Sequence, residues 1–190
     1  YNQDTAMADF RVLTLDWDSF SLICSELRRL TDAAAFRPDI IISVPRGGNY
    51  VLQYGWPDVR HDSVSIIRPH RTSLKTAASY ILRYMPLSWR DRLRIWDAKK
   101  LVNRSGHMSD AEIILPSLDH SIRRVLLVDD AVDSGATLST ICEEFRRNYP
   151  DISFRTAVIT VTAANPVFMP DFYLYHNFTL VRMPWSIDAK

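Results

Sequence analysis

Apolar residues recur at helical spacing in two segments of the chain, with polar residues between them. The first segment follows Asp16 and Asp18, either of which is a suitable helix N-cap. The recurring apolar positions are Phe20, Ile23, Leu27 and Leu30 in the first segment and Leu138, Ile141, Cys142 and Phe145 in the second. Spacings of three and four residues predict an amphipathic helix in each segment.

Shorter, largely apolar runs cover residues 39–44, 63–67, 124–128 and 154–161. Runs without alternation are typical of strands buried on both faces of a parallel sheet. A short helix is expected over 49–54. Strands that alternate with helices predict an α/β fold, with a single doubly wound, mainly parallel sheet flanked by helices. In such sheets ligands bind beyond the carboxyl ends of the strands.

The stretch 68–104 differs from the rest of the chain in its charge, with ten Lys and Arg residues against two Asp residues. Helices are expected over 79–85 and 88–101, and a polar, loop-like stretch follows over 104–119. We therefore expect a basic helical insertion at 68–123 within one domain.

The composition narrows the class of protein. The 190 residues are 47% hydrophobic and carry 23 Lys and Arg against 22 Asp and Glu, which excludes a disordered tail and a wholly basic nucleic-acid coat. The length suits one domain over 1–190, and no apolar run approaches the ~20 residues of a membrane span. Cys24 and Cys142 lie in apolar helical patterns, which favours a reduced, cytoplasmic protein. The histidines lack metal-ligand spacing.

The segment 125–138 carries the clearest candidate chemistry. A buried strand delivers Asp129 and Asp130 at its carboxyl end, and Ser134-Gly135-Ala136-Thr137 then opens a helix. Free backbone N–H groups at a helix N-terminus favour a phosphate monoester, and Gly135 lets the backbone approach it. Carboxylates accept hydrogen bonds from sugar hydroxyls or bind Mg²⁺. The segment predicts a phosphosugar site; the alternative is an ordinary Asp-rich turn and capped helix.

A second element, Pro45-Arg46-Gly47-Gly48, follows the strand predicted at 39–44. Its backbone N–H groups are expected to face the same crevice, and Arg46 supplies charge for a pyrophosphate. Taken alone, the tetrapeptide is equally compatible with a plain turn.

The segment 125–138 resembles the signature of the type I phosphoribosyltransferases, which bind phosphoribosyl pyrophosphate (PRPP). Residues 45–48 resemble the pyrophosphate loop of that family, in which the peptide before Arg46 would be cis. Leu15-Asp16-Trp17 and the tail 170–185 resemble bacterial xanthine–guanine phosphoribosyltransferases, whose C-terminal hood, here 163–190, closes over a purine.

The resemblance implies a Mg²⁺-dependent transfer of the phosphoribosyl group from PRPP to a ring nitrogen, with release of pyrophosphate. It assigns pyrophosphate to Arg46, Gly47 and Gly48, and the ribose hydroxyls and Mg²⁺ to Asp129 and Asp130. It also assigns the 5′-phosphate to Ser134, Gly135, Ala136 and Thr137, and the general base to Asp133. A PRPP-binding regulator on the same fold is the alternative.

The acceptor site departs from the family pattern. A lysine that binds a 6-oxo group in the purine enzymes is replaced by Thr162, and the stacking aromatic is replaced by Leu180, with Phe178 nearby. We expect these three residues to contact the acceptor, a purine or another small nitrogen heterocycle.

The family also suggests a role for the basic insertion. A mobile loop closes over PRPP there, and Arg68, Arg71 and Lys75 stand where it would begin. Trp89 and Trp96 recur at helical spacing, so the sequence most favours a helical face that is solvated or contacts another subunit. A lid is the second interpretation of the insertion, and a nucleic-acid surface is the third. Family members are commonly oligomers, so we expect a homo-oligomer.

Overall fold

The computed structural model describes residues 11–67, 112–177 and 179–186. Its main sheet has five strands in the order β3-β2-β6-β7-β8, and all of its neighbouring pairs are parallel. The strands are β2 (Ile40–Ser43), β3 (His61–Ser63), β6 (Arg124–Val132), β7 (Ser153–Val161) and β8 (Phe172–His176). The predicted α/β fold with a parallel sheet is confirmed. The helices predicted at 79–85 and 88–101 lie outside the described residues.

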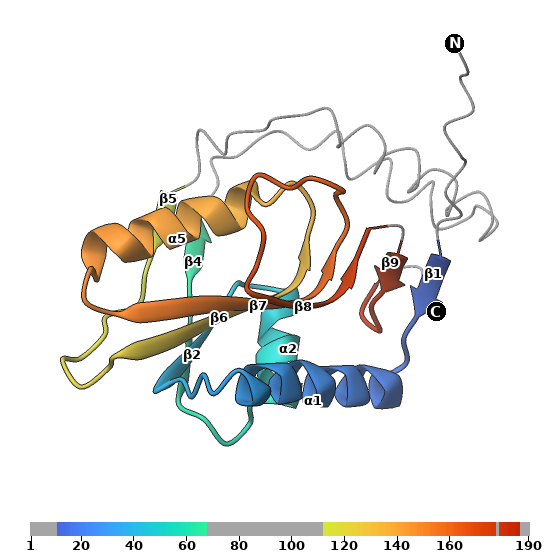
Figure 1. The fold of residues 1–190 in the computed structure, drawn as a ribbon, viewed down its shortest axis with the longest axis horizontal. Coiled ribbons are helices and arrows are strands. Elements are labelled where there is room, and N and C mark those ends of the chain that lie inside the picture. Colours follow the sequence, from blue (N-terminus) through green and yellow to red (C-terminus); the bar gives the residue numbers. More distant parts are fainter. Residues whose placement is uncertain (1–10, 68–111, 178, 187–190) are drawn as a thin grey trace, which may run out of the picture.

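Helices cover both faces of this sheet (Figure 1). α1 (Trp17–Ala33) and α2 (Gly47–Gly55) lie on one face, and α5 (Ala136–Asn148) lies on the other. Successive strand residues point to opposite faces, so Ile41 packs in the layer of α1 while Ile40 and Ile42 pack in the layer of α5. Both faces are buried, which explains why the strands are apolar at consecutive positions.

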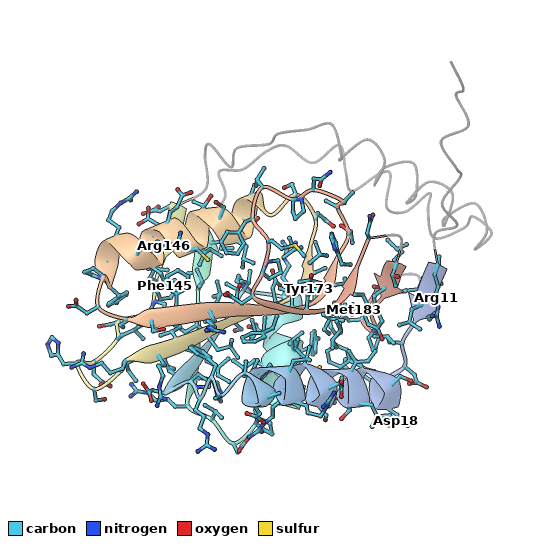
Figure 2. The ribbon with its side chains drawn as sticks, in the orientation of Figure 1. Arg11, Asp18, Phe145, Arg146, Tyr173 and Met183 are labelled. Carbon is cyan, nitrogen blue, oxygen red and sulfur yellow. The ribbon has the colours of Figure 1, made fainter. Side chains whose placement is uncertain are left out.

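The two helical layers have separate cores (Figure 2). Phe145 of α5 is buried in one layer, and Met183, close to the C-terminus, is buried in the other with α1.

Asp16 is the N-cap of α1, because its Oδ1 accepts a 2.8 Å hydrogen bond from the Ser19 N–H. Asp18, the other candidate, lies exposed in the first turn.

Two small sheets complete the fold. β1 (Arg11–Thr14) pairs in parallel with β9 (Thr179–Arg182), and β4 (Ser65–Ile67) pairs antiparallel with β5 (Glu112–Ile114). The segment 163–190, expected to form a hood, therefore divides: β8 extends the main sheet, and β9 joins the N-terminal strand.

The structure corrects several predicted boundaries. β6 continues through both aspartates to Val132 instead of ending at Val128. The run 63–67 contributes to two sheets, and the stretch expected to be loop-like contains β5. Helix α2 begins at Gly47, two residues earlier than expected, because the glycine pair itself forms its first turn.

Candidate functional site

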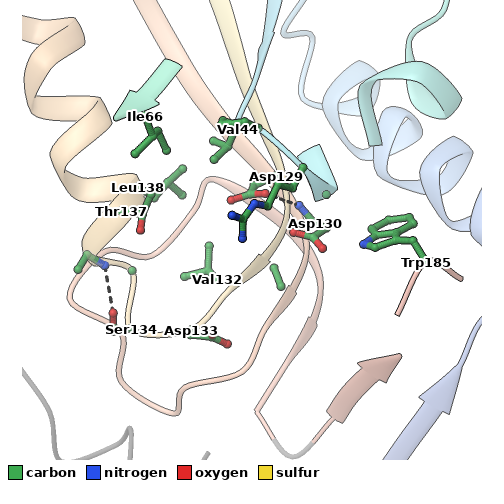
Figure 3. A pocket seen from close by; sticks show the side chains of 16 residues that line it. Val44, Ile66, Asp129, Asp130, Val132, Asp133, Ser134, Thr137, Leu138 and Trp185 are labelled. Carbon is green, nitrogen blue, oxygen red and sulfur yellow. Dashed lines mark hydrogen bonds between the residues drawn. The ribbon is translucent and has the colours of Figure 1, made fainter. Parts of the chain in front are cut away.

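A cavity of about 740 Å³ opens at the carboxyl ends of β2 and β6 and at the N-terminus of α5 (Figure 3). Neighbouring parallel strands end at the same edge of the sheet, so the sequence segments 44–47 and 129–138 meet there. The lining residues are Val44, Pro45, Arg46, Gly47, Ile66, the run from Asp129 to Leu138, and Trp185. The cavity thus gathers most of the phosphosugar site predicted from the sequence.

Asp129 and Asp130 lie together on the cavity wall. The Asp130 N–H donates a 2.8 Å hydrogen bond to Asp129 Oδ1. Burial raises the pKa of both carboxyl groups, and the neighbouring Asp130 raises the pKa of Asp129 further. A bound cation would relieve this repulsion, and two carboxylates beside a phosphate-bearing ligand form a suitable donor set for Mg²⁺.

The start of α2 is in tight contact with β6. A Cβ on Gly47 would lie 2.0 Å from Asp130 Cγ, and a Cβ on Gly48 would lie 2.6 Å from the Val128 carbonyl oxygen. Only glycine allows this approach, which brings the helix N-terminus against the acidic pair. Gly47 lines the cavity, whereas Gly48 packs behind it.

Arg46 is the N-cap residue of α2, with an exposed side chain and φ of 81°. Positive φ is uncommon for arginine and marks a constrained turn. The cis peptide expected before Arg46 is absent, because every peptide bond among the described residues is trans.

The segment 134–137 forms the predicted turn into α5. Gly135 is the N-cap residue and has φ of 82°, and the Ala136 N–H donates a 3.3 Å hydrogen bond to Ser134 Oγ. The loop after β7 supports this turn, since the Val167 N–H donates to the Ser134 carbonyl at 2.8 Å. A Cβ on Gly135 would lie 2.7 Å from the Phe168 carbonyl oxygen, so the turn has no room for a side chain there.

Asp133 is exposed at the end of β6 and lines the cavity. Its Oδ1 accepts a 2.6 Å hydrogen bond from the hydroxyl of Thr162, which follows β7. The Thr162 N–H donates to the Val132 carbonyl at 2.9 Å, extending the ladder between the two strands. The structure therefore pairs the expected general base with one expected acceptor residue.

Thr162 itself is not among the residues that line the cavity, and the other expected acceptor residues are placed differently. Leu180 lies on β9 opposite Val12 and does not line the cavity, and Phe178 lies outside the described residues. The sequence did not single out Trp185 as a site residue, although it belongs to the tail that resembles the purine hood. Trp185 lines the cavity and stacks on Tyr50, with ring centroids 4.4 Å apart.

Two global features are absent from the described part of the chain. None of its helices combines the length and hydropathy needed to cross a membrane. Residues 11–67, 112–177 and 179–186 hold no cluster of three or more His, Cys, Asp or Glu side chains suited to a metal ion. A two-carboxylate Mg²⁺ site, completed by the ligand, is compatible with this finding.

No protein-family model matches the sequence, and no curated protein shows significant similarity to it. Solved structures match across nearly the whole chain. The Helicobacter pylori xanthine-guanine-hypoxanthine phosphoribosyltransferase has a TM-score of 0.65 at 16% identity, over 94% of this chain and 96% of that one. A purine phosphoribosyltransferase from Pyrococcus horikoshii has a TM-score of 0.58 at 18% identity, over 92% and 93%.

A third match is a hypothetical protein from Neisseria gonorrhoeae with bound ppGpp. Its TM-score is 0.60 at 14% identity, over 94% of this chain and 92% of that one. At these identities the matches establish architecture. The chain therefore has the type I phosphoribosyltransferase fold.

Proposed function

We propose that this protein is a Mg²⁺-dependent phosphoribosyltransferase, which transfers the 5-phosphoribosyl group of PRPP to a ring nitrogen of a small heterocycle, most simply a purine. One observation carries the proposal: a single cavity is lined by a pair of half-buried aspartates and by the N-terminal turn of α5. These groups suit the ribose ring and the 5′-phosphate of one molecule.

The cavity supplies a partner for each part of PRPP. Ser134 to Thr137 bind the 5′-phosphate, and Asp129 and Asp130 bind the ribose hydroxyls, directly or through Mg²⁺. Arg46 and the Gly47 amide bind pyrophosphate. Asp129 and Asp130 would hold Mg²⁺, which would supply positive charge beside the leaving group.

In the reaction, a ring nitrogen forms a bond to C1 of the ribose as the bond from C1 to pyrophosphate breaks. Positive charge develops on the ribose and negative charge on the leaving group, so positioning and electrostatics provide most of the catalysis. Asp133 accepts the proton that the heterocycle loses, which makes the attacking nitrogen a better nucleophile.

The test is pyrophosphate release from PRPP and Mg²⁺ with a panel of heterocycles, for the unmodified protein and for Asp133→Asn. Asp133→Asn should bind PRPP with unchanged affinity in calorimetry and turn over about 10²-fold more slowly, since it lacks the proton acceptor. The matched control is Asp151→Asn, which changes an exposed aspartate outside the cavity lining. An unaltered rate for Asp133→Asn would remove that residue from the role.

A regulator that binds a phosphorylated nucleotide is the second candidate. It is favoured by one observation, the ppGpp bound to the Neisseria gonorrhoeae protein of the same architecture. This alternative predicts PRPP or ppGpp binding in calorimetry without pyrophosphate release for any heterocycle. Release with even one heterocycle would favour the transferase.

A further inference from the structure

We infer that the acceptor is a heterocycle with an exocyclic amino group beside its ring N–H, and that Thr162 selects it over the corresponding oxo compound. The inference rests on the proposed function, because it treats Asp133 as the group that accepts the ring proton. It uses the hydrogen bonds around the end of β6, where Asp133 and Thr162 meet.

The hydroxyl hydrogen of Thr162 is committed to Asp133. A carboxylate only accepts hydrogen bonds, so in the 2.6 Å contact the hydroxyl is the donor. The other acceptor within reach, the Val132 carbonyl, lies 3.3 Å away and already receives the Thr162 N–H at 2.9 Å. With its hydrogen used, Thr162 Oγ1 offers only lone pairs to a ligand.

Asp133 and Thr162 therefore present only hydrogen-bond acceptors to a ligand. Asp133 is exposed and lines the cavity, and the half-buried Thr162 lies behind it, outside the lining, with its hydroxyl 2.6 Å from the Asp133 carboxylate, so a ligand that contacts Asp133 comes next to this hydroxyl. A heterocycle that gives its ring N–H to Asp133 places the neighbouring exocyclic group near Thr162. An amino group there donates a hydrogen bond to Thr162 Oγ1. An oxo oxygen is itself an acceptor, so its lone pairs and those of Oγ1 repel each other.

No cation offsets this preference in the described part of the cavity wall. Arg46 is the only basic side chain among the described lining residues, and it belongs to the turn between β2 and α2. β6 separates β2 from β7, after which Thr162 lies. The single charged donor of the described lining is thus placed at the pyrophosphate end.

Nucleoside 5′-monophosphates test the inference by binding alone. AMP, IMP and purine riboside 5′-monophosphate share the phosphate and ribose but carry an amino group, an oxo group or hydrogen at one ring carbon. Calorimetry should rank AMP tightest and IMP weakest, with about a tenfold difference, the size of one net hydrogen bond at a partly exposed site. Ribose 5-phosphate is titrated as a ligand without a base.

Three variants at position 162 make the test specific. Thr162→Ser keeps the hydroxyl and should keep the preference, while Thr162→Val removes it and should bring AMP to the level of the unsubstituted nucleotide. Thr162→Lys supplies a donor without an acceptor and should bind IMP more tightly than AMP.

The outcomes separate the inference from the proposed function. Equal affinities for AMP and IMP, or tighter IMP binding to the unmodified protein, overturn the acceptor class even if PRPP is consumed with release of pyrophosphate. Failure to bind ribose 5-phosphate and all three nucleotides overturns the phosphosugar site, and the inference with it. AMP preference that survives Thr162→Val overturns the role of Thr162.

Discussion

At the residue scale, the cavity depends on glycines, which have no side chain, as much as on the side chains that line it. Gly47 is in contact with the Asp130 carboxyl group at a distance where no Cβ fits. The same aspartate is half-buried beside Asp129, and its loss of contact with water raises the pKa of its carboxyl group. Gly47 and the Asp130 carboxyl group are therefore packed so closely that a larger side chain at position 47 would displace the carboxyl group.

Gly47→Ala is predicted to lower the free energy of unfolding by about 1–3 kcal/mol, the usual cost of overpacking, and to abolish PRPP binding. The physical reason is that the new Cβ would displace Asp130, whose Cγ lies 2.0 Å from that position. Urea denaturation and calorimetry with PRPP measure the two effects.

The control is a substitution at the other end of the same helix. Gly55→Ala places a Cβ 3.5 Å from the Cys24 carbonyl oxygen, an ordinary contact, and should be tolerated. A double mutant with Asp130→Ala removes the clashing atom and should recover most of the lost stability. A full loss that persists in this background would show that Asp130 is not the cause.

At the scale of elements, the site is assembled where helices begin. α2 starts beside the acidic pair, α5 starts at the phosphate turn, and α1 starts after the strand that pairs with β9. Each start uses a different device: a positive-φ arginine for α2, a left-handed glycine for α5 and a side-chain cap for α1. Of these three helix starts, those of α2 and α5 contribute residues to the cavity lining, whereas the start of α1 lies outside it.

Asp16→Ala is predicted to destabilise the protein by about 1 kcal/mol, because it leaves the Ser19 N–H without its cap. Asp18→Ala is the matched control. Asp18 is exposed in the first turn, where it interacts with the helix dipole, and its loss should cost about 0.3–1 kcal/mol. Chemical denaturation of both variants decides the order, and a larger loss for Asp18→Ala would contradict the assignment of the cap.

The sequence predicted these elements where hydrophobic periodicity was uninterrupted. The stripe from Phe20 to Leu30 and the run before Asp129 were located correctly. The end of β6 was missed because two aspartates and an alanine look like a turn, yet the ladder to β7 continues to Val132. The end of β6 is set by its pairing with β7, which the local sequence does not specify.

Some features of the site could likewise be predicted from local sequence, and others could not. Dense local motifs were enough to predict that Arg46 and the run from Asp129 to Thr137 share one cavity. The stacking of Trp185 on Tyr50 and the hydrogen bond from Thr162 to Asp133 are contacts between distant segments. Such contacts follow from the fold, which a local pattern does not specify.

At the scale of the whole molecule, two helical layers enclose the sheet and each contains one cysteine. Cys24 lies in the core of the α1 layer and Cys142 in that of the α5 layer. Burial raises the pKa of both thiols to about 12. Each cysteine therefore reports on one face of the sheet.

Because only the thiolate reacts, neither cysteine should be modified by a disulfide reagent at pH 8 until its layer opens. Rates should rise with denaturant, and Cys24→Ser and Cys142→Ser give single-thiol proteins that follow the two layers separately. Equal rates in the two proteins would indicate cooperative opening of the whole domain. Rapid labelling of either thiol without denaturant would contradict the burial of that thiol.

The pairing of β4 with β5 has a consequence for how this protein can change over evolutionary time. Ile67 lies opposite Glu112, so the two ends of the stretch 68–111 are adjacent in space. The intervening stretch can be lengthened, shortened or exchanged without shifting the register of any strand in the main sheet. Since Ile66 lines the cavity, both ends of that stretch are anchored beside it, and variation between them can change the chemistry near the cavity while the main sheet stays constant.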